Sequence, residues 1–364
     1  QFFCPILLLL GPKQQMKIKK LLIQRSFRFP QPSRKMSSGD DAAHRRYPND
    51  LASLAKYIAS DDCRSITVLT GAGISVASGI PDFRSPGGMY DTLRPDLISA
   101  TPQERRLMEI DPTYVVSWDI FKTNPLPYLE VRRPFILGTQ QQRWKATLGH
   151  WFFDVLQSKT DKLTRIYTQN IDGLFYQLDN LPREKIVDVH GSIANVACEV
   201  CHHPISLEDF CKKVQTNIKD IYKIDREAPN ESKHILCESC QRPTLKPTTV
   251  LFGRNLPEVF WQYSEKDMPE TDLLIIAGTS LVVSPANSLV CRASKHSARV
   301  LVNREPAGEE LGLDLSAKDP NSRDLFLQGD CDSIFLELAQ ELGWLDSLMA
   351  LKDKLPQGSA SLLN

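Results

Sequence analysis

The stretch "VLTGAGISVASGIPDFRSP", residues 68–86, places a glycine pair directly after an apolar strand. Gly71 and Gly73 would let the backbone approach a pyrophosphate closely where the next helix begins. The stretch lacks the third glycine of the usual dinucleotide fingerprint, and a tight turn without a ligand uses the same residues. Neither interpretation explains why Asp82, Phe83 and Arg84 follow so soon after the turn.

Five apolar runs share one form: none alternates with polar residues, and each ends in small or polar residues, as buried parallel strands do. They span 65–70, 163–170, 185–191, 271–280 and 298–305. Helical patterns lie between several of these runs, as at 144–159, and after the last of them at 330–344. Another helical pattern precedes them at 49–61, where Asn49 or Asp50 is the expected N-cap. This order predicts an α/β fold, a Rossmann-like doubly wound parallel sheet.

The carboxyl ends of these strands carry the glycines and polar residues that interrupt an otherwise apolar sequence. In open parallel sheets, ligands bind outside such ends. The residues are Gly71, Gln169, Asn170, His190, Gly278, Thr279, Ser280, Asn303 and Arg304. No acid follows the first helix and strand to hold a ribose, so Asn303 is the candidate for that contact.

Two C-x-x-C pairs, Cys198 with Cys201 and Cys237 with Cys240, are separated by 35 residues. Together they offer four thiolates to one tetrahedral Zn²⁺, whereas redox pairs or surface thiols are the alternative. Four sulfur ligands would close the coordination sphere, so the expected ion is structural. The sequence around and between the pairs is polar, which predicts a smaller inserted zinc-binding module at about residues 192–248.

Two further segments carry side chains suited to catalysis. His190 stands at a strand end, where a neutral imidazole is suited to work as a general base, although a structural histidine would fit as well. In "TQNIDGL", Gln169, Asn170 and Asp172 offer amides and a carboxylate for hydroxyls and a carboxamide. A capped turn would use the same residue types.

Charge is distributed unevenly along the chain. Residues 1–39 contain eight basic residues and no acid, so of 44 basic and 44 acidic residues the remainder holds 36 and 44, a net charge of −8. A folded part of that sign gives no support to direct nucleic-acid binding. No apolar run reaches the roughly 18 residues that a membrane span needs.

The basic leader, residues 1–45, is expected to be disordered or to act in targeting. From Met16 it has the composition of a mitochondrial presequence, and a basic tail or untranslated sequence ahead of Met36 are the alternatives. The mitochondrial matrix is thus suggested, with cytoplasm or nucleus as alternatives. A catalytic domain at 46–350 and a C-terminal tail at 351–364 complete the expected organisation.

The chain resembles the sirtuins, NAD⁺-dependent protein deacylases. The segments that carry the resemblance run in family order from about Leu51 to Trp344. They are "GAGISVASGIPDFRSP", "TQNIDGL", "VHGS", the two cysteine pairs, "VLFG", "GTSLVVSPA", "LVNRE" and "GDCD".

The resemblance implies a role for each matching residue. His190 would be the general base and Asn170 would position the ribose and a water; Asp82, Phe83 and Arg84 would belong to a lid over the nicotinamide ribose. The NAD-binding set is Gly71, Ala72, Gly73, Ser75, Ile80, Asp82, Phe83, Arg84, Gln169, Asn170, Ile171, Asp172, Gly278, Thr279, Ser280, Asn303, Arg304 and Cys331. The substrate-binding set is Val250, Leu251, Phe252, Gly253, Leu281 and Val282.

The implied reaction is transfer of an acetyl group from a protein lysine to ADP-ribose. The acyl oxygen attacks the ribose carbon as nicotinamide leaves, and His190 then deprotonates a ribose hydroxyl. The products are lysine, nicotinamide and O-acetyl-ADP-ribose. Acetylated protein substrates would bind as an added β-strand between 250–253 and 278–285.

The chain departs from the family in three places. Arg254 stands where many relatives have an acid after "FG", and "SPGGMYDTL" is a compact lid segment. "NPLPYLEVRR" lacks the Tyr-x-x-Arg pair of the desuccinylase branch, because Tyr128 and Arg132 are four apart, and this favours a deacetylase. A desuccinylase or long-chain deacylase, a mono-ADP-ribosyltransferase at the same NAD site, and a non-enzymatic scaffold are the alternatives.

Overall fold

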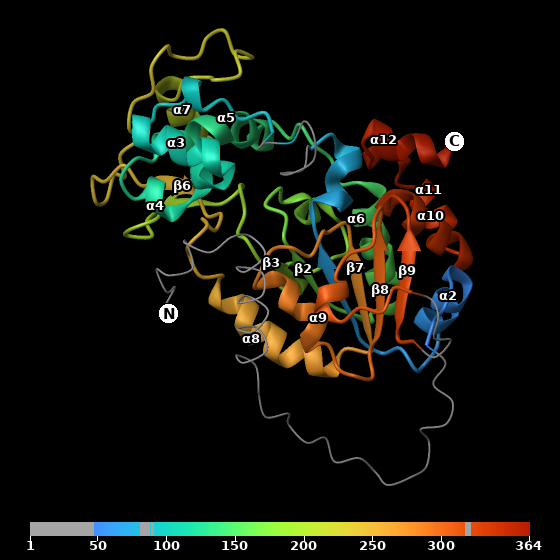
Figure 1. Ribbon diagram of the computed structural model, residues 1–364. Coiled ribbons are helices and arrows are strands. Elements are labelled where there is room, and N and C mark those ends of the chain that lie inside the picture. Colours follow the sequence, from blue (N-terminus) through green and yellow to red (C-terminus); the bar gives the residue numbers. More distant parts are fainter. Residues whose placement is uncertain (1–46, 81–87, 89–90, 317–321) are drawn as a thin grey trace, which may run out of the picture. The chain divides into compact units, whose positions relative to one another are not determined.

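The computed structural model describes residues 47–80, 88, 91–316 and 322–364 (Figure 1). The leader and the Asp82-Phe83-Arg84 segment lie outside the described residues. The residues from 46 onward form one compact unit. Among the described helices, none has the length and apolar content to cross a bilayer.

A six-stranded parallel sheet forms the larger part of this unit, in the order β3-β2-β1-β7-β8-β9. The strands are β1 (Ile66–Thr70), β2 (Leu163–Thr168), β3 (Ile186–Asp188), β7 (Leu273–Ala277), β8 (Ala298–Asn303) and β9 (Asp324–Gln328). The five predicted strands are confirmed, and β9 is an addition at the edge. Because the chain runs outward from β1 to β3 and then returns to β7, the strand order reverses between β1 and β7, where such sheets bind ligands.

Apolar side chains on both faces of the sheet explain why its strands read as continuous apolar runs. In β7, Ile275 and Ala277 belong to one core, whereas Leu274 and Ile276 belong to another. The helices α2 (Leu51–Ala59), α6 (Leu148–Thr160) and α10 (Cys331–Glu341) cover the first face. The helices α8 (Glu258–Asp267) and α9 (Leu289–Arg292) cover the second (Figure 1). The sheet is therefore doubly wound, as predicted.

The first of these helices begins as the sequence predicts. The Asp50 side chain accepts a hydrogen bond from Ser53 N–H at 2.7 Å, and the Ser53 hydroxyl lies 3.0 Å from Asp50 N–H. This reciprocal capping box satisfies backbone donors that an α-helix cannot satisfy itself.

A second, smaller part is built around a three-stranded antiparallel sheet, β5-β4-β6. Its strands are β4 (Val196–Cys198), β5 (Pro204–Ile205) and β6 (Leu245–Pro247). In the chain, α7 (Leu207–Asn217) lies between β5 and β6. One hydrophobic core joins this sheet to α3 (Pro102–Ile110), α4 (Trp118–Phe121) and α5 (Leu126–Gln140). Two separate stretches of chain therefore form the smaller part, and the sequence analysis had assigned only the second to it.

The last residues of the chain pack against the larger part. After α11 (Leu345–Met349), short helical turns carry Leu355, Ser359 and Leu363, all of which are buried. The last of these turns are η10 (Lys352–Lys354), α12 (Gln357–Ala360) and η11 (Ser361–Leu363). Within the described residues, the other 3-10 helices are η2 (Ala72–Ser78), η3 (Pro95–Leu97), η4 (Pro112–Val116), η5 (Leu174–Gln177), η6 (Arg183–Lys185), η7 (Met268–Glu270), η8 (Ala286–Ser288) and η9 (Glu309–Leu311).

A buried histidine in α6 predicts an acid-sensitive fold. Burial lowers the pKa of His150 from its ordinary value of 6.5 to about 3. Between those pH values the unfolded chain binds a proton that the folded chain does not. As the pH falls through that window, this side chain should lower the free energy of unfolding by about 1.4 kcal/mol per pH unit.

The measurement is urea unfolding of the wild type and His150→Gln between about pH 7 and about pH 4. Glutamine at the third helical position still accepts the Thr147 N–H, as in a capping box, but does not titrate. The variant should show the shallower dependence on pH, and the exposed His296→Ala control should follow the wild type. Equal slopes for His150→Gln and wild type would contradict the prediction.

Candidate active site at the strand ends

The loops that follow β1 and β7 are in direct backbone contact. Gly71 N–H donates to the Ala277 carbonyl at 3.0 Å, and Gly73 N–H donates to the Gly278 carbonyl at 2.8 Å. A Cβ atom on Gly73 would lie 2.6 Å from the Gly278 Cα, and Gly278 has a φ of +62°. Glycine is required here because two backbones touch where the strand order reverses.

The segment after Gly71 is the short 3-10 helix η2 rather than an α-helix. Asn170 holds it from the end of β2, because its Nδ2 donates to the Gly71 carbonyl at 3.0 Å and to the Ser75 hydroxyl at 3.1 Å. A carbonyl can only accept, so the amide nitrogen faces the loop and Oδ1 is the atom that remains to accept from a ligand hydroxyl. Asn170 is buried.

Asp172 extends this polar cluster. It accepts the Ser75 hydroxyl at 2.7 Å and the Leu174 N–H at 3.0 Å. Burial raises the pKa of this carboxyl above its ordinary value, while the two hydrogen bonds oppose the shift. The sequence analysis placed Ser75, Asn170 and Asp172 at one site, and the structure brings all three together.

Gln169 couples β2 to the loop after β7. Its Nε2 donates to the Thr279 hydroxyl at 3.0 Å, and that hydroxyl also accepts the Leu281 N–H at 3.1 Å. Ser280, which lies between Thr279 and Leu281 in the chain, is exposed. The amide is thereby held at the same edge of the sheet as the glycine loop.

His190 lies two residues beyond the end of β3. Its Nδ1 is 2.9 Å from the Gln169 carbonyl. Because that oxygen can only accept, Nδ1 carries a proton, and the lone pair of the neutral ring is at Nε2. The His190 carbonyl accepts the Val250 N–H at 2.8 Å, and a Cβ on Gly191 would clash with the Thr248 carbonyl at 2.0 Å. His190 is therefore fixed against the segment that leads into residues 250–253.

The remaining NAD-binding candidates lie near the same sheet edge. The Gly278 N–H donates to the Val302 carbonyl, and the next residue, Asn303, donates from Nδ2 to the Glu305 carbonyl at 2.8 Å. Arg304 pairs with Asp330, and Cys331 is buried at the start of α10. Ala72 lies in the glycine loop, Ile80 lies just beyond η2, and Ile171 follows Asn170. Asp82, Phe83 and Arg84 fall outside the described residues.

The substrate-binding candidates differ in exposure. The side chains of Leu251 and Leu281 are buried, whereas Phe252 is 41% and Val282 65% exposed. Phe252 N–H donates to the Val116 carbonyl at 3.1 Å, and its own carbonyl accepts the Trp118 N–H at 2.9 Å. The sequence analysis missed this pairing with residues 116–118, since no local pattern in that segment indicates a strand.

The four cysteines of the smaller part form one cluster. The Sγ atoms of Cys198 and Cys240 are 3.6 Å apart, as are those of Cys201 and Cys237, and all four lie within 4.8 Å of one another. Four sulfurs at about 2.3 Å from a tetrahedral ion would be separated by about 3.8 Å. The cluster is therefore compatible with one structural Zn²⁺.

The backbone of the two pairs has matching geometry. The His202 N–H donates to the Cys198 carbonyl at 3.0 Å, and the Gln241 N–H donates to the Cys237 carbonyl at 2.8 Å. Both His202 and Gln241 have a positive φ. Each pair is thus a tight turn that points two sulfurs toward one centre.

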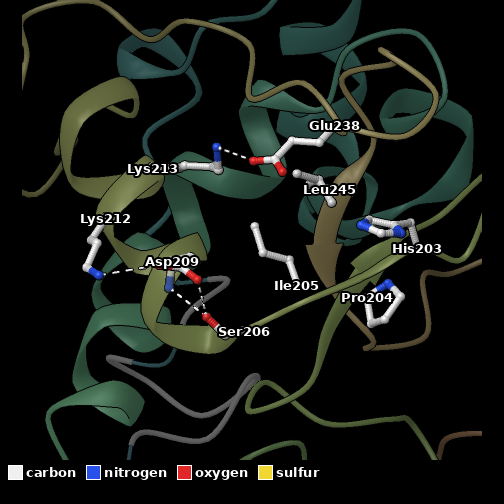
Figure 2. Close-up of a pocket in the computed structure, with 9 residues that line it drawn as sticks. All are labelled: His203, Pro204, Ile205, Ser206, Asp209, Lys212, Lys213, Glu238 and Leu245. Atoms are coloured by element: carbon white, nitrogen blue, oxygen red, sulfur yellow. Dashed lines mark hydrogen bonds and ion pairs between the residues drawn. The ribbon is translucent and has the colours of Figure 1, made fainter.

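A cavity of about 460 Å³ lies in the smaller part (Figure 2). It has an apolar floor of Ile205 and Leu245, and its rim carries ion pairs of Lys213 with Glu238 and of Lys212 with Asp209. The other lining residues are His203, Pro204 and Ser206. Its lining includes none of the strand-end residues, so this cavity is separate from the candidate active site.

Comparison with known proteins identifies the family. Residues 71–285 match the Sir2 family. The NAD-dependent protein deacetylase sirtuin-2 of Danio rerio is 34% identical over 310 residues, which cover 82% of this chain and 73% of the relative. The chain belongs to the Sir2 family. The matched region contains the glycine loop, His190 and both cysteine pairs, and it ends before Asn303 and Cys331.

Two further relatives and a solved structure agree. The NAD-dependent protein deacetylase hst2 of Schizosaccharomyces pombe is 32% identical over 304 residues, covering 83% of this chain and 79% of the relative. The NAD-dependent deacetylase sir2A of Dictyostelium discoideum is 34% identical, and the match covers 86% of this chain but 56% of the longer relative. A solved Sir2 enzyme aligns with a TM-score of 0.59 and 23% identity, over 81% of this chain and 98% of that one, which supports the fold.

The glycine contact predicts the effect of adding one methyl group. Gly278→Ala should destabilise the fold by about 1–3 kcal/mol more than a change at an unhindered glycine, because its Cβ would lie 2.5 Å from the Ile74 nitrogen. Gly343→Ala is the matched control, since Gly343 also has a positive φ but has open space around it. Urea unfolding of both variants measures the difference, and equal destabilisation would contradict the prediction.

The cysteine cluster predicts a bound metal. Elemental analysis of the purified chain should find about one zinc ion per molecule, and Cys201→Ser should reduce that content to near zero and lower the melting temperature. The control is Cys211→Ala, which alters a buried cysteine of the same part that lies outside the cluster. Retention of zinc by Cys201→Ser would contradict the four-cysteine site.

Proposed function

We propose that this chain is an NAD-dependent protein lysine deacetylase that transfers the acetyl group to ADP-ribose and releases nicotinamide and O-acetyl-ADP-ribose. The observation that carries the proposal is the position of His190, held by a backbone carbonyl at a strand end beside Gln169 and Asn170. The names of its relatives in the Sir2 family support the same activity.

The strand-end loops suit a dinucleotide. Gly71, Gly73 and Gly278 carry no side chains, so a pyrophosphate could approach the backbone of these loops, where the Thr279 side chain lies against Gly71. Asn303 would contact the adenine ribose from the end of β8. When bound, NAD would supply the electrophilic ribose carbon and the leaving nicotinamide.

His190 would act on the proton of a ribose hydroxyl. With Nδ1–H donated to the Gln169 carbonyl, Nε2 is the basic atom of the neutral ring, and the same carbonyl stabilises the ring after it has taken the proton. Asn170 would orient the ribose and a water through Oδ1, because its nitrogen is used by Gly71 and Ser75. The buried carboxyl of Asp172 would help to hold the carboxamide.

An acetylated protein segment would pair with residues 250–253 as a β-strand. In an extended chain, successive residues direct their N–H and C=O groups to opposite sides. Phe252 already pairs with Val116 and Trp118 on one side, so the Leu251 N–H is directed to the other. The chain turns directly after Phe252, because Gly253 has a φ of +88° and the Leu251 carbonyl accepts the Arg254 N–H at 3.0 Å. Main-chain pairing there, flanked by the exposed Phe252 and Val282, would bind many sequences.

The two departures that the structure describes are compatible with a deacetylase. Arg254 lies 4.6 Å from the Trp118 ring and pairs with Glu199 at 3.3 Å, so its charge is partly compensated. Tyr128 is 1% exposed and its hydroxyl is 2.6 Å from that of Thr249. That hydroxyl is therefore engaged within the protein, which supports the choice of acetyl over acidic acyl groups.

The test is to incubate the protein with NAD⁺ and an acetyl-lysine peptide and to separate the products by chromatography. We expect nicotinamide and O-acetyl-ADP-ribose in equal amounts. His190→Ala should reduce the rate by about 100- to 10,000-fold, the usual contribution of a general base. His296→Ala, an exposed histidine, is the control and should keep the wild-type rate.

The other outcomes distinguish the alternatives. Turnover of succinyl or long-chain acyl peptides in place of acetyl peptides would replace the deacetylase with another deacylase. Nicotinamide release without an acyl peptide, together with ADP-ribose attached to protein, would indicate a transferase. Full activity in His190→Ala would remove the assigned base.

A further inference from the structure

The start of helix α6 depends on two residues from the far end of the chain. The first N–H groups of an α-helix have no partner within the helix. In α6, the Leu148 N–H donates to the Ser359 hydroxyl at 3.2 Å, and the Gly149 N–H donates to an Asp332 carboxylate oxygen at 2.8 Å. The Ser359 hydroxyl donates to the other oxygen of Asp332 at 2.5 Å. All of these groups are buried.

The same helix start holds the glycine loop of the candidate active site. The N-cap residue of α6 is Thr147, whose hydroxyl donates to the Ile74 carbonyl at 2.8 Å. Ile74 stands in η2 next to Ser75. Its side chain packs on Gly149, where an added Cβ would lie 3.1 Å from Ile74 Cγ1. A continuous buried network therefore runs from Ser359 to η2.

A second contact between the C-terminal segment and η2 is direct. A Cβ atom on Gly358 would lie 2.9 Å from the Ala77 carbonyl, so the backbone of α12 rests against the end of η2. Leu355 and Leu363, on either side, belong to the same hydrophobic core as Ile74. The segment is thus anchored at both of its ends while its middle supports the loop.

We propose that Ser359 is a positioning residue for NAD: the C-terminal segment, residues 355–363, supports η2 from its outer side and keeps the glycine loop in the shape that receives the pyrophosphate. This inference rests on the proposed function, since it takes the glycine loop to be the dinucleotide site. It assigns a binding role to the segment that the sequence indicated only as a tail.

The proposal separates NAD binding from peptide binding. The peptide side of the site is held by other contacts, namely Val250 N–H to the His190 carbonyl and Phe252 to residues 116–118. Neither involves the network from Ser359. A change at Ser359 should therefore weaken NAD binding and leave the affinity for the acetyl peptide as it was.

The experiment measures NAD affinity by calorimetry and the KM values for NAD and peptide in the full-length chain. Ser359→Ala should raise the Kd and KM for NAD by about three- to tenfold, as expected for the loss of a buried hydrogen bond, with kcat and the peptide KM unchanged. Ser361→Ala is the matched control, because this exposed serine donates within its own turn, to the Gly358 carbonyl at 2.8 Å. It should match the wild type.

A second variant covers the case in which Ser359→Ala is poorly folded. Gly358→Ala keeps every hydrogen bond of the network but presses a methyl group on the Ala77 carbonyl, and it should also raise the KM for NAD selectively. Unchanged NAD affinity in both variants would overturn the inference, as would an equal rise in the KM values for NAD and peptide. A wild-type chain that neither binds nor consumes NAD would instead refute the proposed function.

Discussion

The backbone contact between Gly73 and Gly278 is the constraint on which the rest of the site depends. The loops after β1 and β7 approach so closely that neither position has room for a Cβ atom. Because the polar groups of these loops are thereby fixed, side chains at the end of β2 can bond to them. Asn170 reaches the Gly71 carbonyl, and Gln169 reaches Thr279 across the sheet. One steric contact thus orders polar groups from three strands.

The smaller part of the molecule contacts the candidate active site through the residues that follow β6. The segment that leaves the second cysteine pair runs through β6 to Thr248, whose carbonyl packs on Gly191, and to Val250, which bonds to the His190 carbonyl. Glu130, which is fully buried, ties the two stretches of this part together by accepting from Ser99 N–H and the Ser232 hydroxyl. A structural zinc ion would therefore stabilise the surroundings of His190 without touching the reaction.

The sequence predicted what local patterns determine. The four inner strands of the larger sheet were recognisable because both of their faces are buried, and the edge strand β3 because Ile186 and Val187 are buried. At the other edge, β9 has only Leu325 buried, and β4 to β6 have two or three residues each, without a long apolar run. Asn170 and His190 were predicted as site residues because they are polar residues at the ends of apolar runs. Ser359 was not predictable, since its bond to Leu148 spans 211 residues, and the Trp118 bond to Phe252 follows no motif.

Two histidines show why residue type alone does not single out the proposed base. His150 is fully buried beside Phe175, and its pKa of about 3 means that it cannot take up a proton near neutral pH. His190 is only partly buried, and its Nδ1–H bond to a carbonyl persists whether or not Nε2 is protonated. A base needs an environment that tolerates its charged form, and a carbonyl partner stabilises that form. The position proposed for the base, beyond β3, has such a carbonyl, whereas the start of α6 uses its imidazole to cap a helix.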